Sequence, residues 1–149
     1  MTTFYGSYEH SIDDRGRVAI PAKYRASFVV GVVLRLGPEG CVELYTPERF
    51  EEEKDQLLGE SGGMRTQAGR RMRRQYLANV SDQPLDKQGR IVLSPTLRAQ
   101  AGLSEKATIV GCGDYIEIWD PARWETELAS VERETRIDGG PGAAAGDGS

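Results

Sequence analysis

The residues best placed to do chemistry in this sequence belong to a short motif that occurs twice. The motif has the spacing Asp-x-x-Gly-Arg, and its two copies, 73 residues apart, are Asp13, Gly16 and Arg17, and Asp86, Gly89 and Arg90. A turn aspartate can accept hydrogen bonds from the turn backbone, and glycine tolerates the left-handed conformation that a Cβ disfavours. Arginines beside such a turn can contact phosphates or pair with guanine edges in the major groove of DNA. We therefore expect two cationic turns suited to a nucleic acid.

The same motif is also compatible with roles that involve no nucleic acid. Each aspartate could pair with the arginine of its own copy merely to lock the turn. Asp13 and Asp14 could in principle hold a metal ion or act as a carboxylate pair, but the turn already accounts for the acid. The sequence contains no nucleophile elbow, phosphate-cradling glycine loop or metal-ligand spacing, and Cys41 and Cys112 lack a CxxC arrangement. We expect no enzyme activity, metal site or cofactor, and interpret both cysteines as small buried hydrophobic residues.

The motif is part of a longer tandem repeat. Residues 13–25 align with 86–98, and residues 41–50 align with 115–124 at an offset of 74, so one inserted residue between the two blocks accounts for the difference. Apolar alternation and turn residues predict strands at 8–12, 17–20, 29–36, 41–45, 107–111 and 115–119. Short helices should follow Pro21 and Pro95, and longer ones are expected at 47–58, 64–78 and 121–131, the first and last behind the capping residues Thr46 and Asp120.

The chain is accordingly divided into two repeats and two other segments. The first repeat covers residues 5–58, a linker and basic helix cover 59–79, and the second repeat covers 80–134. The remaining segment, 135–149, is rich in glycine and alanine and cannot bury a core, so we expect a disordered tail.

Charge is unevenly distributed along the chain. The net charge of −4 and the pI near 5.1 argue mildly against nucleic-acid binding. However, residues 64–76 carry five arginines and no acid, whereas 47–60 carry six acids against two bases. We interpret the arginine-rich segment as a solvated face or a partner of acidic helices in a neighbouring subunit, in preference to a DNA contact. No apolar run reaches the ~20 residues of a membrane helix, which predicts a cytoplasmic protein.

The motif followed by an apolar strand, a proline and a basic short helix resembles the AbrB-type swapped-hairpin domain. Two copies, each with a glycine turn, an aromatic-ended strand and a Pro-led helix, resemble the MraZ family from about residue 5 to 134. Ser94 departs from the pattern, because Pro21 stands at the equivalent place, and this leaves the start of the second short helix open.

The resemblance implies an α+β fold, a tandem AbrB/MraZ-like swapped-hairpin β-barrel with short flanking helices. It also implies subunits joined into a ring-shaped homo-oligomer, in the cytoplasm and associated with the nucleoid. Family members bind double-stranded DNA at direct repeats upstream of their own operon, in the division and cell-wall gene cluster, and act mainly as repressors. Neither a membrane nor a small-molecule substrate is implied.

The expected DNA-binding residues are the basic side chains on or just after the two turns. They are Arg15, Arg17, Lys23 and Arg25 in the first repeat, and Lys87, Arg90 and Arg98 in the second. Because Gln88 stands where the first repeat has Arg15, we expect the first hairpin to be the principal reader. The main alternative is an oligomeric protein-interaction scaffold without DNA binding, which the acidic net charge favours. A hydrolase using Asp13 and Asp86 is a much weaker third hypothesis.

Overall fold

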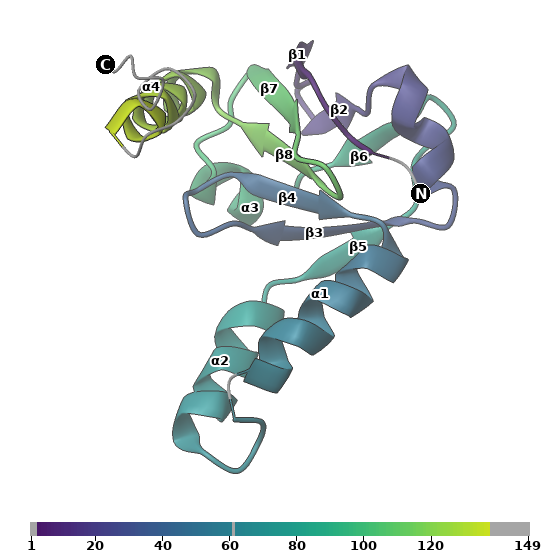
Figure 1. Cartoon of the computed structure of the whole chain (residues 1–149). Helices are drawn as coiled ribbons and strands as arrows, with labels where there is room; N and C mark the ends of the chain where they lie inside the picture. Colours follow the sequence, from purple (N-terminus) through teal and green to yellow (C-terminus); the bar gives the residue numbers. More distant parts are fainter. Residues whose placement is uncertain (1–2, 61, 138–149) are drawn as a thin grey trace.

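The computed structural model describes residues 3–60 and 62–137 as an α+β fold of eight strands and five helices (Figure 1). The strands are β1 (Ser7–Ser11), β2 (Arg17–Ala19), β3 (Val32–Leu36), β4 (Val42–Tyr45), β5 (Ser81–Gln83), β6 (Arg90–Val92), β7 (Lys106–Gly111) and β8 (Ile116–Trp119). The helices are the 3-10 helix η1 (Ala22–Phe28), α1 (Pro47–Glu60), α2 (Gln67–Leu77), α3 (Pro95–Gln100) and α4 (Pro121–Ile137). None of the described helices combines the length and the apolar character that a membrane span requires.

The two repeats complete each other's sheets. A six-stranded antiparallel sheet has the order β1-β7-β8-β4-β3-β5, and β2 pairs with β6 in a second, two-stranded sheet. Thus β1 of the first repeat pairs with β7 of the second, and β5 of the second repeat pairs with β3 of the first. Each repeat therefore depends on the other for hydrogen bonds that its own strands leave unmade.

The strand register reveals a local twofold relation between the repeats. Val18 pairs with Ile91 in the small sheet, and Glu43 pairs with Glu117 where β4 meets β8. These partners occupy equivalent positions of the duplicated sequence, at offsets of 73 and 74. Equivalent residues can face each other in an antiparallel pair only if a twofold axis passes between them. The duplicated chain thus folds like a dimer joined into a single polypeptide.

The expected β-barrel is not closed. Among the described residues, the pairings leave β1 and β5 at the two edges of the large sheet and keep β2 and β6 in a separate sheet. The α+β class is confirmed, but the fold consists of two open sheets. The small polar strand β5 escaped prediction because its sequence, Ser-Asp-Gln, lacks the apolar alternation of a half-buried strand.

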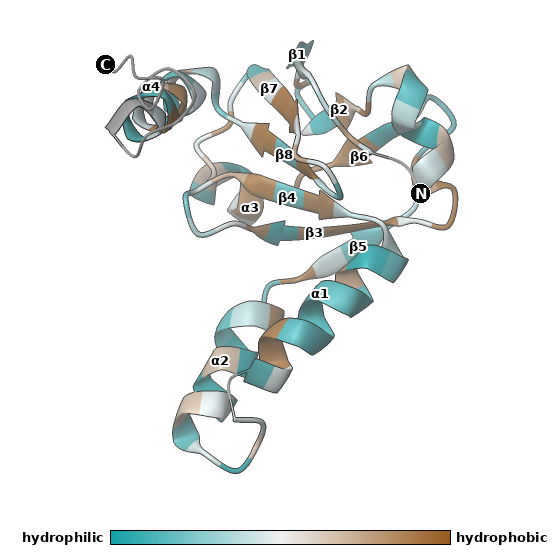
Figure 2. Ribbon diagram, in the orientation of Figure 1, coloured by the Kyte–Doolittle hydropathy of each residue, from teal (hydrophilic) through white to brown (hydrophobic). Residues whose placement is uncertain are grey.

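One core joins both repeats. Its fully buried side chains come from each half of the chain, and the largest include Ile20, Phe28, Leu34, Ile91, Leu93, Ile109, Ile116 and Ile118. A second cluster on the other face of β4 contains Tyr45, Phe50 and Tyr76. Strand β4 is therefore buried on both faces, Leu44 in the first cluster and Tyr45 in the second. Figure 2 shows hydrophobic segments in β4, β7 and β8, whereas β5 and most of α1 are hydrophilic.

Several helix boundaries differ from the sequence-based expectation. Ser94 caps α3, since its hydroxyl accepts a hydrogen bond from the Leu97 N–H at 3.2 Å, which explains how serine replaces proline there. The strand predicted from residue 29 begins only at Val32, and the apolar Val29 and Val30 are 78% and 86% exposed. Helix α4 continues to Ile137, into the range predicted as a tail, and residues 138–149 lie outside the described part.

Replacing Ile91 by alanine should test the inter-repeat core. Ile91 is fully buried on the local twofold axis, so Ile91→Ala is expected to lower the free energy of unfolding by about 2–5 kcal/mol in urea titrations. The neighbouring Val92 is 48% exposed, and Val92→Ala should change the same quantity by less than about 0.5 kcal/mol. Equal effects of the two substitutions would contradict a shared core at this pair.

Candidate nucleic-acid interface

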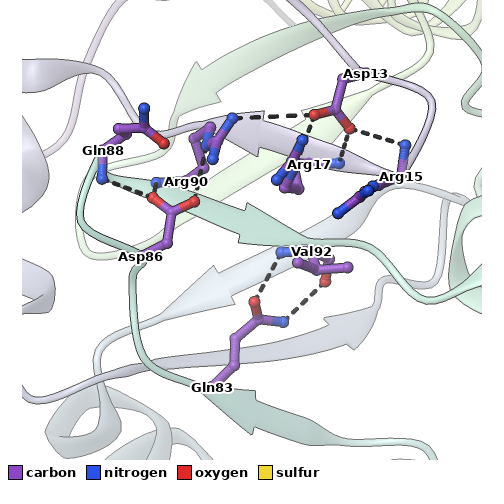
Figure 3. A network of polar contacts seen from close by, with 8 residues as sticks. All are labelled: Asp13, Arg15, Arg17, Gln83, Asp86, Gln88, Arg90 and Val92. Carbon is purple, nitrogen blue, oxygen red and sulfur yellow. Dashed lines mark hydrogen bonds and ion pairs between the residues drawn. The ribbon is translucent and has the colours of Figure 1, made fainter.

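The two motif turns lie side by side because β2 and β6 pair antiparallel (Figure 3). In the first turn, Asp13 Oδ1 accepts hydrogen bonds from the backbone N–H groups of Arg15 at 3.0 Å and Arg17 at 2.8 Å. In the second turn, Asp86 Oδ1 makes the equivalent contacts with Gln88 and Arg90, at 2.8 and 2.9 Å. Each aspartate therefore satisfies the backbone of its own turn, as the sequence indicated.

The second carboxylate oxygen of each aspartate binds the motif arginine. Arg17 Nε lies 2.6 Å from Asp13 Oδ2, and Arg90 Nε lies 2.8 Å from Asp86 Oδ2. One Arg90 Nη atom also approaches Asp13 Oδ2 to 4.0 Å, so the two turns are coupled electrostatically. Each close contact uses the Nε atom of the arginine. The Nη groups of each guanidinium can therefore still donate hydrogen bonds to another acceptor. The turn lock and a DNA contact are thus not exclusive.

These contacts stabilise the charged form of both carboxylates. The hydrogen bond from the Arg17 backbone, aided by the Arg17 side chain, lowers the pKa of Asp13 from its ordinary value of 3.8 to about 2. The backbone N–H of Arg90 likewise holds the pKa of Asp86 below its usual range. Both turns therefore remain locked at neutral pH.

Arg25 and Arg98 pack across the glycine turn of the opposite repeat. Gly89 has a φ of +77°, and a Cβ there would overlap the Arg25 side chain, whose Nε donates to the Ile20 carbonyl at 2.9 Å. Gly16 has a φ of +81°, and a Cβ there would meet the Leu93 carbonyl oxygen at 2.7 Å, with an Nη atom of Arg98 in ordinary contact at 3.6 Å. Reciprocal backbone bonds complete the arrangement, from Ile20 N to Gly89 O at 2.9 Å and from Leu93 N to Gly16 O at 2.8 Å.

Lys23 has a different environment from the turn arginines. Its ammonium group lies 4.3 Å from the ring centre of Tyr5 and 5.1 Å from those of Tyr8 and Tyr24. Contact with the Tyr8 hydroxyl is the main cause that raises the pKa of Lys23. Such cation–π contacts favour a fixed, charged lysine. No local pattern signals this cage, because Tyr5 and Tyr24 are 19 residues apart and meet only in the tertiary structure.

The structure thus separates the seven expected DNA-binding residues into four groups. Arg15 and Lys87 are exposed on the two turns, and Arg17 and Arg90 stand behind them as half-buried partners of the aspartates. Arg25 and Arg98 clamp the turns, while Lys23 lies in the tyrosine cage. An added element is Gln83, whose side-chain amide bonds both backbone groups of Val92, at 2.7 and 2.8 Å, and ties the small sheet to β5.

Known proteins resemble this chain over nearly its whole length. The family model described as "MraZ protein, putative antitoxin-like" matches residues 3–74 and 77–139. A transcriptional regulator MraZ from Kocuria rhizophila is 37% identical over 87% of this chain and 89% of its own length. Proteins of the same name from Herpetosiphon aurantiacus and Thermomicrobium roseum are 40% and 38% identical, covering 88% and 87% of this chain and 90% and 91% of their own.

The pH dependence of stability should report the Asp13 lock. Because folding lowers the pKa of this group, its stabilisation is fully present above the ordinary value of 3.8 and is lost as pH falls through about 2. Asp13→Asn should therefore lower the melting temperature at pH 7, and the difference from wild type should shrink towards pH 2. The exposed neighbour Asp14 provides the control, Asp14→Asn. A constant Asp13→Asn deficit across this range would exclude the carboxylate as its cause.

The Arg25 clamp can be tested at Gly89. Any side chain at a positive φ costs about 1–2 kcal/mol, and at Gly89 it must also displace Arg25. Gly89→Ala should therefore destabilise the protein more than Gly63→Ala, because Gly63 has a φ of +67° but open space around its Cβ. Adding Arg25→Ala should reduce the extra cost of Gly89→Ala in a double-mutant cycle. An additive cycle would show that Arg25 does not occupy the space above the turn.

Proposed function

Because the chain belongs to the MraZ family of transcriptional regulators, we propose that it binds double-stranded DNA sequence-specifically and acts mainly as a repressor of its own operon. The observation that carries the proposal is the pair of adjacent cationic turns at the β2–β6 ribbon. A two-stranded ribbon fits the major groove of B-DNA, where arginine can pair with the O6 and N7 atoms of guanine. The relatives are named as regulators and not as enzymes.

The inter-repeat strand pairs support the swapped-hairpin interpretation. With β1 on β7 and β2 on β6, hairpin strands of one repeat complete sheets of the other. This interleaving fixes both turns in one rigid unit, so that their basic side chains can meet a single DNA groove. Because the β2–β6 ribbon is already formed in the unbound protein, less conformational entropy is lost on binding.

We assign the principal contacts to the first turn. Arg15 is exposed, and its only hydrogen bond among the described residues is made by its backbone N–H, so its guanidinium is available to DNA. The second turn has the neutral Gln88 at the equivalent position, with Lys87 beside it. Arg17 and Arg90 can reach DNA through their Nη groups. Arg25, Arg98 and Lys23 then act chiefly by shaping the binding unit.

One subunit offers few contacts, because each turn also contains acids. Every phosphate neutralised steepens the log–log salt dependence of binding by only about 0.9. We therefore propose that several subunits of a ring-shaped homo-oligomer bind successive direct repeats upstream of the operon in the division and cell-wall gene cluster. Avidity then supplies affinity that a single subunit lacks. Such a regulator works in the cytoplasm, associated with the nucleoid, and needs no small-molecule substrate.

A protein-interaction scaffold is the second candidate. The net charge of −4 is the observation that favours it, since it disfavours the approach of DNA. This candidate predicts an assembled protein that ignores its own upstream DNA even at low salt.

Arg15→Ala separates these candidates. Fluorescence anisotropy with the DNA upstream of its own gene should show binding weakened by about 1–3 kcal/mol, if Arg15 pairs with a base. Gln88→Ala, at the equivalent place in the second turn, is the matched control and should bind like wild type. Scrambled DNA measures non-specific affinity. Equal, weak binding of wild type to both DNAs, with assembly intact, would favour the scaffold.

A further inference from the structure

Helices α1 and α2 form an arm that projects from the sheets (Figure 1). The connection between these helices and the start of α2 carry an exposed apolar residue and several arginines. Met64 is 67% exposed, and Arg65, Arg70 and Arg71 are exposed around it. An Nη atom of Arg70 donates to the Met64 carbonyl at 2.9 Å, which fixes the backbone of this residue. None of the three arginines forms an ion pair with another described residue. We call these four residues the arm tip.

A complementary surface lies where α1 begins. A cavity of about 280 Å³ has apolar walls that include Phe4, Val30 and Pro47, and the charged residues Glu48, Arg49, Glu52 and Asp114 complete its lining. Arg49 is already shared between Glu52, at 3.2 Å, and Asp114, at 3.1 Å, so the cavity keeps a net negative charge. We call this cavity, together with the exposed Val29 that precedes Val30 in the chain, the root cavity.

The exposure of two adjacent valines next to an apolar cavity is energetically unfavourable in water. Val29 and Val30 are 78% and 86% exposed, although single exposed apolar residues elsewhere need no explanation. An apolar patch with a polar rim is typical of a protein interaction site. The acidic rim selects a cationic partner, and the apolar walls select one that also carries an apolar side chain.

The arm tip has both properties but cannot reach the root cavity of its own chain. The two surfaces lie at opposite ends of α1, whose 14 residues span about 21 Å at 1.5 Å per residue. The occupant that matches the cavity in charge and polarity is therefore the arm tip of a second copy. DNA is a poorer match for these arginines, because the arm and the β2–β6 ribbon lie in different parts of the molecule in Figure 1.

We propose that the arm tip of one subunit docks in the root cavity of the next, with Met64 in the apolar hollow and the arginines against Glu48 and Glu52. The inference rests on the proposed self-association and names the surfaces that produce it. Because the two surfaces differ, the contact is head-to-tail, and repeated contacts close into a ring when the rotation between subunits permits. Opposite charges also make this assembly sensitive to salt.

Charge reversal tests the pairing without DNA. Arg70→Glu/Arg71→Glu makes the arm tip acidic, and Glu48→Arg/Glu52→Arg makes the root cavity basic. Each variant alone places like charges together, and its subunit dissociation constant should rise on the order of 100-fold. In an equimolar mixture, every contact between unlike variants joins opposite charges, so the mixture should reassemble, as should a chain carrying all four substitutions. Native mass spectrometry and light scattering give the masses, and circular dichroism checks folding.

Matched controls decide the alternatives. Lys106→Glu/Arg133→Glu changes the charge as much as the arm variant, at exposed positions of β7 and α4, and should assemble normally. Met64→Ser should weaken assembly while leaving every charge in place. Retention of the wild-type mass by the arm variant would overturn the interface, and loss of its DNA binding at that mass would assign the arm to DNA. Dissociation without reassembly on mixing would also overturn the pairing. A wild type that is monomeric at low salt would overturn the interface together with the proposed self-association, whereas DNA binding is measured independently.

Discussion

The antiparallel strand pairs between the repeats hold the chain in one structure, and the β2–β6 pair among them places the two turns together. Val18 and Ile91, both buried, face each other on the local twofold axis, and each strand belongs to a different repeat. The backbone bonds between Ile20 and Gly89 and between Leu93 and Gly16 extend the contact to the turns. This arrangement joins the core, carries both turns to one place and orients their arginines. A separate repeat would have none of these features.

The charged residues of the two turns both stabilise the turns and orient the motif arginines. Asp13 and Asp86 accept hydrogen bonds from the turn backbone and from the Nε atoms of Arg17 and Arg90. These two arginine side chains are therefore already ordered in the unbound protein. The same acids offset much of the local positive charge. In the DNA-binding function proposed above, this arrangement would favour geometry over electrostatic attraction and limit the affinity of each subunit. The proposed assembly of several subunits would then supply the remaining affinity.

The second axial pair shows how the duplicated halves have diverged. Glu43 and Glu117 face each other across β4 and β8, where like charges are destabilising. Glu43 is stabilised by Arg35 at 2.8 Å and the Tyr45 hydroxyl at 3.1 Å. Glu117 instead accepts from the Tyr115 hydroxyl and the Trp119 indole, at 2.8 and 2.9 Å. The hydroxyls of Tyr45 and Tyr115 and the indole of Trp119 therefore satisfy the carboxylates of this pair.

Local sequence was enough to establish the duplication, the two aspartate turns, most strands and the prolines that begin α1 and α4, because these depend on periodicity and backbone preference. Burial of Cys41 also followed from its apolar surroundings, although Cys112 is only half-buried. The strand pairing emerged only from the folded chain, and with it the open sheets and the formation of β5 from a polar tripeptide. Folding also gave Arg25 and Lys23 side-chain partners that the exposed Arg15 lacks among the described residues, although all three look alike in sequence. Hydrogen bonding and cation–π contact join residues that are far apart in the chain, and no local pattern records such partners.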